Sequence, residues 1–425
     1  MQTAKNVKLN VKGDIQGSNV IVGDHNISLG EVNGGIVNII QQKEQEVFEP
    51  LPRPVGLRPR PIPNFLNRIS EIEKIKLAFK SSMPVSLFGE NGIGKTSLLR
   101  QIAYIQEANQ FADGIVYILA NDEGCEDLLQ LIFDAFYKSN LNIKPTETQI
   151  RTYLKSTRAL IILDDIKLQR EDTQFLLDAV PNSVFIFTSL ERSLWGDGYI
   201  IALDGLPENE SLQLFVRELG RNLKDDEIES AKKICATLFH HPLRILQTAS
   251  MIREDGLGIP LVLSTLTNAQ AKSPVLEATL EKSNETQKKM LSLLAVAGGY
   301  MLTREHLASL AGNIRDEDLQ PLIKRGFVSE AESGFTLSGE AVLSLSKMWD
   351  LSGWEDALLN HFANFLQSAP QGMLVDKLAD TLFYLIQRAG EKKQWKHVVV
   401  IGRWLERLYA VKKKWQGWLK ILNLL

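Results

Sequence analysis

The stretch GENGIGKTS, Gly89–Ser97, constrains the fold more than any other feature of this chain. It has the pattern G-x-x-x-x-G-K-[ST] between an apolar run and an amphipathic run, which is typical of a phosphate-binding loop between a strand and a helix. Lys95 is expected to reach the β- and γ-phosphates of a nucleotide, and the Thr96 hydroxyl to ligate Mg²⁺. A chance glycine turn is the alternative. The residues assigned to nucleotide binding here are Gly89, Glu90, Asn91, Gly92, Ile93, Gly94, Lys95, Thr96 and Ser97.

Apolar strands alternate with amphipathic helices from residue 64 to residue 206. MPVSLF, GIVYILA, ALIILDDI and SVFIFTSL are near-continuous apolar runs, whereas TSLLRQIAYIQEA and CEDLLQLIFDAFY have helical periodicity. Strands that are apolar on both faces are typical of a parallel sheet covered by helices on both sides. We therefore predict an α/β P-loop NTPase core with a parallel sheet over residues 64–206.

Two carboxylates end one of these apolar strands. LIILDD, Leu160–Asp165, is expected to deliver them to the carboxyl edge of the sheet, where open α/β sheets bind their ligands. Asp164 is predicted to hold Mg²⁺ together with Thr96, and Asp165 to polarise the attacking water. Taken alone, an apolar strand that ends in Asp-Asp is often only a strand that meets solvent.

The strand VFIFTSLER suggests a sensor for the γ-phosphate. Thr188 or Ser189 is expected to lie near that phosphate, and Arg192 is a candidate cation. An exposed arginine at the start of a helix is the alternative interpretation of Arg192.

The remaining sequence divides into further segments. Residues 207–280 predict a helical subdomain, residues 281–350 a winged helix with two short strands in RGFVSEAESGFTLSGEA, and residues 351–425 the start of TPR-like helical repeats that stop mid-pattern. Residues 1–46 are rich in Gly, Asn, Val and Ile and predict short strands, a β-prone N-terminal segment. The dense prolines of residues 47–63 predict an extended linker.

Composition excludes several classes of protein. The net charge of −3 does not call for a nucleic-acid or membrane partner, and the two cysteines, Cys125 and Cys235, lack metal-ligand spacing and form no disulfide framework. No apolar run approaches the ~20 residues that span a bilayer, and the N-terminus lacks a signal-peptide core. We therefore expect a cytoplasmic protein with no membrane span.

Residues 64–348 resemble the STAND ATPases of the NB-ARC type, which are found in plant resistance proteins, apoptosome scaffolds and bacterial defence proteins. The resemblance depends on the winged-helix unit and on six stretches: NFLNRISEIEKI, GENGIGKTS, LIILDD, TSLER, LDGLPENESLQLF and HHPLRIL. It implies ATP or ADP with Mg²⁺ as ligands. It also implies that Arg68 belongs to the opening motif of the site and that Pro242 lies near the adenine.

Two stretches depart from this family pattern. Leu190 stands where the family often has an arginine after the sensor strand. The stretch Leu337–Gly339 stands where the family has Met-His-Asp, whose histidine touches the ADP phosphates.

The stretch NVIVGDHN near the N-terminus resembles the core of RIP homotypic interaction motifs and of amyloid signalling motifs that precede such ATPases. High β-propensity, low charge and no proline suit a cross-β stack. A small β-hairpin cap and a disordered tail remain the alternatives. The motif comprises Asn19, Val20, Ile21, Val22, Gly23, Asp24, His25 and Asn26.

Together these features predict a nucleotide-switched signalling ATPase, with slow hydrolysis that resets the switch. The resemblance implies that it forms a homo-oligomer when an unidentified trigger activates it, and that its N-terminal motif templates an effector with a matching motif in defence or regulated cell death. Two other classes remain: a transcription regulator of the same type that uses its winged helix or the basic, tryptophan-containing segment 388–420 on DNA, and an AAA-like motor. The winged helix is not notably basic, so DNA binding is not assigned. A motor would need an arginine finger, and we locate none.

Overall fold

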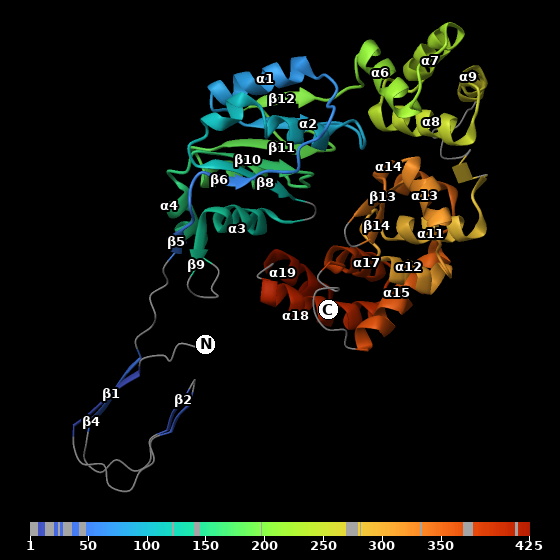
Figure 1. Ribbon diagram of the computed structural model, residues 1–425. Coiled ribbons are helices and arrows are strands. Elements are labelled where there is room, and N and C mark those ends of the chain that lie inside the picture. Colours follow the sequence, from blue (N-terminus) through green and yellow to red (C-terminus); the bar gives the residue numbers. More distant parts are fainter. Residues whose placement is uncertain are drawn as a thin grey trace. The chain divides into compact units, whose positions relative to one another are not determined.

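The computed structural model describes most of the chain and divides it into two compact units, Met1–Pro50 with Tyr137–Ile143 and Leu51–Phe136 with Lys144–Leu425 (Figure 1). The described residues are 7–12, 21–23, 26–28, 36–41, 48–120, 123–139, 145–196, 198–268, 279–280, 282–331, 334–368, 377–412 and 415–425.

The first unit contains three pairs of short antiparallel strands. β1 (Val7–Lys12) pairs with β4 (Ile36–Gln41), and β5 (Phe48–Pro50) pairs with β9 (Tyr137–Ser139). β2 (Ile21–Gly23) pairs with β3 (Asn26–Ser28), so that Val22 lies opposite Ile27. The expected β-prone N-terminal segment is therefore confirmed. Within the proposed interaction motif, Asn19, Val20, Asp24 and His25 lie outside the described residues.

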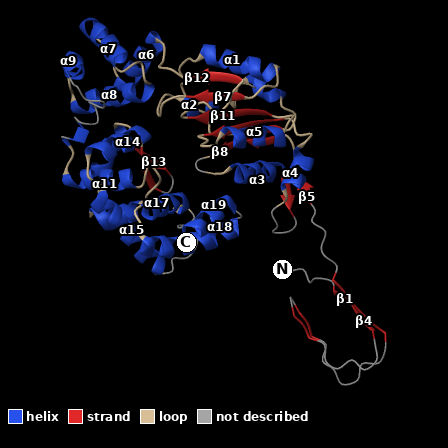
Figure 2. Cartoon of the chain, turned by 180° about the vertical axis from the view of Figure 1, so that it is seen from behind, coloured by secondary structure: helices blue, strands red, loops and turns tan. Residues whose placement is uncertain are grey.

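A six-stranded parallel sheet forms the centre of the nucleotide-binding domain, in the order β12-β7-β11-β10-β8-β6. Figure 2 shows its strands between two layers of helices. From one edge to the other, the strands are β12 (Tyr199–Ala202), β7 (Val85–Phe88), β11 (Val184–Ser189), β10 (Ala159–Asp164), β8 (Gly114–Leu119) and β6 (Val55–Leu57). All residues of β10 and β11 are buried, which is the reason for their continuous apolar sequence. The predicted P-loop NTPase core is confirmed.

Helices cover both faces of this sheet. α1 (Ile69–Lys80) and α2 (Lys95–Ile102) pack on one face, where they share an apolar core with β7, β10 and β11. α3 (Cys125–Phe136), α4 (Glu147–Leu154) and α5 (Arg170–Ala179) pack together on the other face, and Figure 1 shows α3 below the sheet. η1 (Gln106–Gln110) is a short 3-10 helix before β8.

The segment that we expected to be only an extended linker contributes strands, and that expectation was wrong. Val55–Leu57 carries no proline and adds the edge strand β6 to the main sheet, in parallel register with β8. An edge strand needs hydrogen-bond partners on one side only, so prolines that flank it are tolerated. Val55 lies so close to β8 that a Cβ on Gly114 would lie 2.1 Å from the Val55 carbonyl oxygen.

The next two subdomains are a four-helix group and a winged helix. The helical subdomain comprises α6 (Glu208–Leu219), α7 (Asp225–Thr237), α8 (Pro242–Asp255) and α9 (Ile259–Asn268). The winged helix comprises α11 (Glu285–Val296), α12 (Arg304–Ala311), α13 (Asp316–Lys324), β13 (Val328–Ala331), β14 (Gly334–Leu337) and α14 (Gly339–Met348). β13 and β14 form the antiparallel wing, and Leu302 adds a bridge to Phe335.

Helices form the last part of the described chain. They are α15 (Ser352–Gln367), α17 (Ala379–Glu391), α18 (Trp395–Lys412) and α19 (Trp415–Leu424). One apolar core runs through them, the winged helix and the helical subdomain.

Candidate functional site: a phosphate-binding loop and its carboxylates

The glycine loop connects the end of β7 to the start of α2 in the way the motif predicts. Gly92 and Gly94 have φ values of 81° and 103°, which side chains rarely adopt, and Gly94 is the N-cap of α2. A Cβ on Gly92 would lie 2.6 Å from the Leu243 side chain, so glycine is required there for space as well. The loop thus places backbone N–H groups at a helix N-terminus, where anions bind.

Lys95 is buried at the start of α2, and its ammonium folds back over the loop. Its Nζ donates to the carbonyl oxygens of Gly89 at 2.6 Å and Glu90 at 2.9 Å. Burial lowers the pKa of Lys95 from its ordinary value, and the charges of Asp165 and Asp164 oppose that shift. Phosphate oxygens would replace these carbonyl partners and compensate for the buried charge.

Asp164 is 1% exposed and accepts hydrogen bonds from three hydroxyl groups. Thr96 donates to its Oδ1 at 3.2 Å and Thr188 to the same oxygen at 2.5 Å. Tyr117 on β8 donates to Oδ2 at 2.8 Å. Burial, followed by the charge of Asp164, raises the pKa of Tyr117, so the phenol remains protonated and acts as a donor. Asp164 and Thr96 therefore lie together as a carboxylate–hydroxyl pair.

Asp165 also faces the loop, although successive residues of a strand point to opposite faces. It has a φ of 60°, and its N–H donates to the Thr188 hydroxyl at 2.7 Å. This left-handed turn directly after β10 redirects the second carboxylate. The structure thus brings Asp164 and Asp165 to one pocket.

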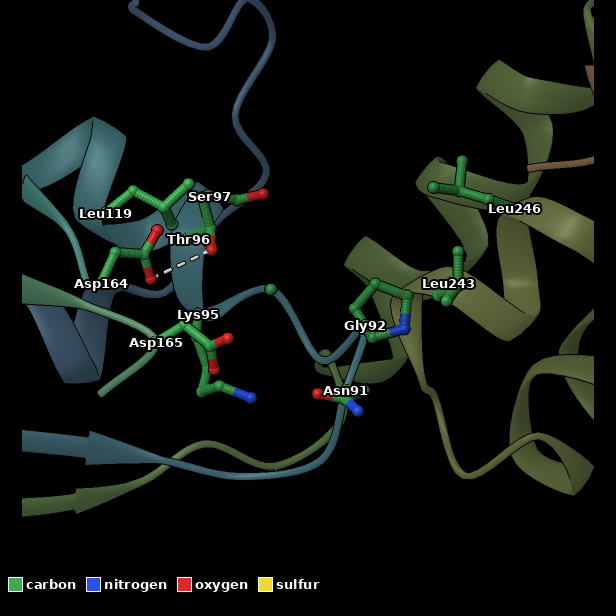
Figure 3. Close-up of a pocket in the computed structure, with 12 residues that line it drawn as sticks. Asn91, Gly92, Lys95, Thr96, Ser97, Leu119, Asp164, Asp165, Leu243 and Leu246 are labelled. Carbon is green, nitrogen blue, oxygen red and sulfur yellow. Dashed lines mark hydrogen bonds between the residues drawn. The ribbon is translucent and has the colours of Figure 1, made fainter. Parts of the chain in front are cut away.

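The pocket over the loop has a volume of about 460 Å³ (Figure 3). One side carries the loop, Lys95 and the two carboxylates, and the helical subdomain supplies Pro242 from the N-terminus of α8. The residues that line it are Asn91, Gly92, Gly94, Lys95, Thr96, Ser97, Leu119, Asp164, Asp165, Pro242, Leu243 and Leu246. The pocket thus has a polar side that suits phosphates and an apolar side that suits a base, as a nucleotide requires.

His241, which precedes Pro242, ties α8 to the loop and was not among the predicted site residues. It is 2% exposed, and its Nδ1 accepts from the Arg244 N–H at 3.4 Å as the N-cap of α8. Its Nε2 lies 3.1 Å from the Asn91 carbonyl oxygen, which assigns the proton to Nε2. Burial lowers the pKa of His241, which favours this neutral form.

Arg244 connects three parts of the second unit, and we call this contact the Arg244 bridge. Its Nε donates to Glu340 of α14 at 2.8 Å, and its guanidinium donates to Glu90 of the loop at 3.2 Å. Beside it, a Cβ on Gly339 would lie 2.8 Å from the Asn91 side-chain amide. The variable positions of the glycine loop are therefore used to contact the helical subdomain and the winged helix.

Arg68 lies beneath the loop and does not line the pocket. It is 5% exposed and donates to the carbonyl oxygens of Ile93 at 3.0 Å and Gly205 at 3.5 Å, while it pairs with Glu71 at 3.0 Å. It thus supports the loop and the chain that leaves the sheet. Ile93 is itself buried under the loop.

The sensor strand contributes Thr188 to the carboxylates, but Arg192 points elsewhere. Arg192 donates to the Leu194 carbonyl oxygen at 2.6 Å, and its guanidinium stacks over the Trp195 ring at 4.9 Å. Ser189 donates to the Glu191 carbonyl oxygen at 2.5 Å. Leu190, in the slot where the family often has arginine, is 51% exposed.

The donor set fits a magnesium nucleotide. A buried carboxylate beside a threonine hydroxyl supplies the oxygen ligands that Mg²⁺ takes alongside phosphates, and the loop with Lys95 supplies donors for the phosphates themselves. Fold and site together define a P-loop NTPase in which helical and winged-helix elements close over the loop.

Comparison with known proteins shows which proteins this chain is similar to. Residues 68–225 match the NB-ARC domain. Regulatory protein AfsR of Streptomyces griseus is 25% identical over 339 residues, which cover 72% of this chain and 35% of AfsR. The ToMV resistance protein Tm-2(2) of Solanum lycopersicum is 26% identical over 186 residues, which cover 40% of this chain and 22% of that protein.

A solved structure shares the fold over most of the chain. It is a signal transduction ATPase with numerous domains (STAND) protein with a tetratricopeptide repeat sensor from Pyrococcus horikoshii, with a TM-score of 0.58 and 17% identity over 86% of this chain and 54% of that one. The chain therefore spans about a third or less of the two curated relatives and about half of this structure. Among the described residues, no helix is long and apolar enough to cross a membrane.

Proposed function

We propose that the protein is a signalling switch that binds ATP or ADP with Mg²⁺ over the glycine loop. The observation that carries this proposal is the convergence of Lys95, Thr96, Asp164 and Asp165 on one pocket that Pro242 of the helical subdomain also lines. Lys95 and the loop N–H groups would hold the phosphates, and Thr96 with Asp164 would hold the metal, which supplies charge neutralisation of the phosphates.

The Arg244 bridge supports a closed state in which the helical subdomain and winged helix rest on the loop. Glu90, Arg244 and Glu340 belong to three segments that any opening of these subdomains would separate. A nucleotide that adds negative charge beside Glu90 would weaken the contact of Glu90 with Arg244, because the phosphates would repel that carboxylate and compete for the same guanidinium. Exchange of ADP for ATP would then favour the open state.

Hydrolysis would be slow and would reset the switch. Asp165 would polarise the attacking water, because Asp164 accepts three hydroxyl hydrogen bonds and would hold the metal. Arg192 is held by Leu194 and Trp195, so no arginine of the sensor strand faces the pocket. Among the described residues that line the pocket, Lys95 carries the positive charge, and without a sensor arginine the transition-state charge would be less stabilised.

The N-terminal strands would transmit the signal to an effector protein. Open protomers of a cytoplasmic homo-oligomer would bring their β-prone segments together, and the motif around Ile21 and Val22 would template a matching segment of an effector in defence or regulated cell death. The pairing of β2 with β3 supports strand formation in this segment.

DNA binding through the winged helix is the competing proposal, and the charge of that unit disfavours it. α13, the third helix of the winged-helix unit, begins with Asp316, Glu317 and Asp318. Carboxylates at a helix N-terminus would repel the DNA backbone, whose phosphates supply most non-specific affinity. A regulator that reads DNA here would bind it more weakly as the salt concentration rises.

Calorimetry with the Lys95→Ala protein tests the nucleotide site. Lys95 lines the pocket and is not part of the apolar core, so we expect the fold to persist. Affinity for both ATP and ADP should fall by at least about tenfold, because hydrogen bonds to charged groups are the strong ones. Lys74→Ala, an exposed lysine of α1, is the matched control and should bind as the unaltered protein does. Normal binding by Lys95→Ala would show that the assignment is wrong.

A further inference from the structure

The hydrogen bond from Tyr117 to Asp164 has no role in the function proposed so far. Tyr117 is half-buried on β8, and its hydroxyl donates to Oδ2 of Asp164 at 2.8 Å. The other carboxylate oxygen, Oδ1, takes the hydrogen bonds of Thr96 and Thr188. Donors therefore contact both oxygens of the same carboxylate.

The register of the sheet places the phenol there. Tyr117 on β8 lies opposite Ile162 on β10, two residues before Asp164. Residues two apart on a strand share a face, so Tyr117 is the diagonal neighbour of Asp164 on the face that carries α2. Ile162 and Tyr117 pack in the same apolar cluster as Leu98 of α2, which fixes the ring of Tyr117.

Donors on both oxygens restrict the orientation of the carboxylate. Rotation about the Cβ–Cγ bond of Asp164 would break the bond from Tyr117 and the bonds from Thr96 and Thr188 together. Because Asp164 is 1% exposed, water cannot replace them without opening the core. The aromatic ring is rigid, so Tyr117 holds its oxygen with little loss of side-chain entropy.

We infer that Tyr117 is a positioning residue of the magnesium site, which keeps Oδ1 of Asp164 directed at Thr96 by holding Oδ2. This inference rests on the proposed function, since it assigns Asp164 and Thr96 to the metal. Partners that orient a metal ligand typically contribute about 10- to 100-fold to metal affinity. Tyr117 would act through Asp164 and would not contact the nucleotide.

Calorimetric titration of the Tyr117→Phe protein with ADP, in EDTA and at a series of Mg²⁺ concentrations, tests this role. Phenylalanine keeps the ring and removes only the hydroxyl, so the fold should persist. We expect the Mg²⁺ concentration that gives half of the metal-dependent gain in affinity to rise about tenfold. The affinity in EDTA should stay unchanged, because the phosphate donors are untouched.

Tyr104→Phe is the matched control, because its hydroxyl donates to the Pro59 carbonyl oxygen at 2.6 Å within the same domain. An unchanged Mg²⁺ midpoint in Tyr117→Phe, or an equal loss of affinity with and without Mg²⁺, would overturn the inference. If either result is found while Lys95→Ala loses nucleotide binding, the role of Tyr117 is wrong but the nucleotide site is still supported. Normal binding by Lys95→Ala would instead remove the proposed function itself.

Discussion

Arg244 of the helical subdomain donates its Nε–H to the Glu340 carboxylate of the winged helix at 2.8 Å. The two residues are far apart in the sequence, and the same guanidinium also reaches Glu90 beside the phosphate-binding loop. The Arg244 and Glu340 side chains are 29% and 20% exposed, so solvent screens their attraction only in part. One arginine therefore links the loop to two subdomains.

Loss of this link should loosen the closed state. We expect Arg244→Ala to release ADP about fivefold to tenfold faster, because a partly buried charged contact contributes about 1 kcal/mol. Stopped-flow measurement of a fluorescent ADP analogue gives the rate. Arg253→Ala is the matched control, since Arg253 also lies on α8 but pairs with Glu218 and Glu254.

Reversal of both charges tests whether the bridge acts by pairing. Glu340→Arg alone should speed ADP release as Arg244→Glu does, and the double variant should recover part of the slow rate. Arg244→Glu also places two carboxylates near each other at Glu90, so full recovery is not expected. If all of these variants release ADP at the rate of the unaltered protein, the Arg244 bridge has no part in nucleotide exchange.

The two carboxylates after β10 should differ in their effects. Asp164→Asn removes the charge that Thr96 faces, so the gain in affinity from Mg²⁺ should fall by about tenfold or more. Asp165→Asn should keep ATP affinity and lower the single-turnover hydrolysis rate by about 100-fold, as loss of a general base does. If Asp165→Asn hydrolyses ATP at the normal rate, that carboxylate has no part in the chemistry.

A histidine pair, buried at His306 and half-buried at His361, should make the stability depend on pH. His306 of α12 and His361 of α15 lie 2.8 Å apart between Nδ1 and Nε2. Burial, with the charge of His361, lowers the pKa of His306 to about 4, and burial also lowers that of His361. The unfolded chain takes up protons below about pH 6.5, whereas folded His306 stays neutral until about pH 4. Stability should therefore fall as the pH drops through this window.

Thermal unfolding at about pH 7.5 and about pH 5 measures this effect. His306→Leu removes the titrating ring, so the difference between the two melting temperatures should shrink. The variant should also be less stable at the higher pH by about 1 kcal/mol, because it leaves the His361 nitrogen of this half-buried contact without its partner. An undiminished pH dependence in His306→Leu would assign the effect to other groups.

The sequence predicts the features that depend on neighbouring residues in the chain. Apolar runs identify β7, β8, β10 and β11, because strands buried on both faces have to be apolar. The loop pattern places Lys95 and Thr96 at a helix N-terminus, and the strand end places Asp164 at the same edge. The roles of these residues toward a nucleotide remain predictions.

Contacts between distant segments could not be predicted in this way. Three such contacts form only after separate elements pack together: His241 with Asn91, Arg244 with Glu340, and Tyr117 with Asp164. No local periodicity in the sequence encodes these pairs. Arg192 was predicted to be a sensor residue, but its guanidinium lies over the Trp195 ring. The local sequence is the same in both cases, so it could not tell them apart. Proline density likewise hid the edge strand Val55–Leu57, which lies between the prolines.

The N-terminal strands allow a test of the output route. If the motif around Val22 transmits the signal, a peptide of residues 1–46 should form fibrils with a spacing of about 4.7 Å along the fibre axis. In the folded chain Val22 lies opposite Ile27 and Gly23 opposite Asn26 within one hairpin, so fibril growth has to replace these pairs by pairs between chains. Val22→Asp would stack like charges in every layer, and Gly23→Pro would remove a ladder donor, so each substitution should stop fibril growth.

Each substitution should leave ATP binding intact, because the glycine loop belongs to the other compact unit. A hairpin that only caps the protein would behave differently: the peptide would stay soluble, and Val22→Asp would lower the melting temperature of the nucleotide-binding domain. X-ray fibre diffraction of the peptide and thermal unfolding of the full chain decide between these outcomes.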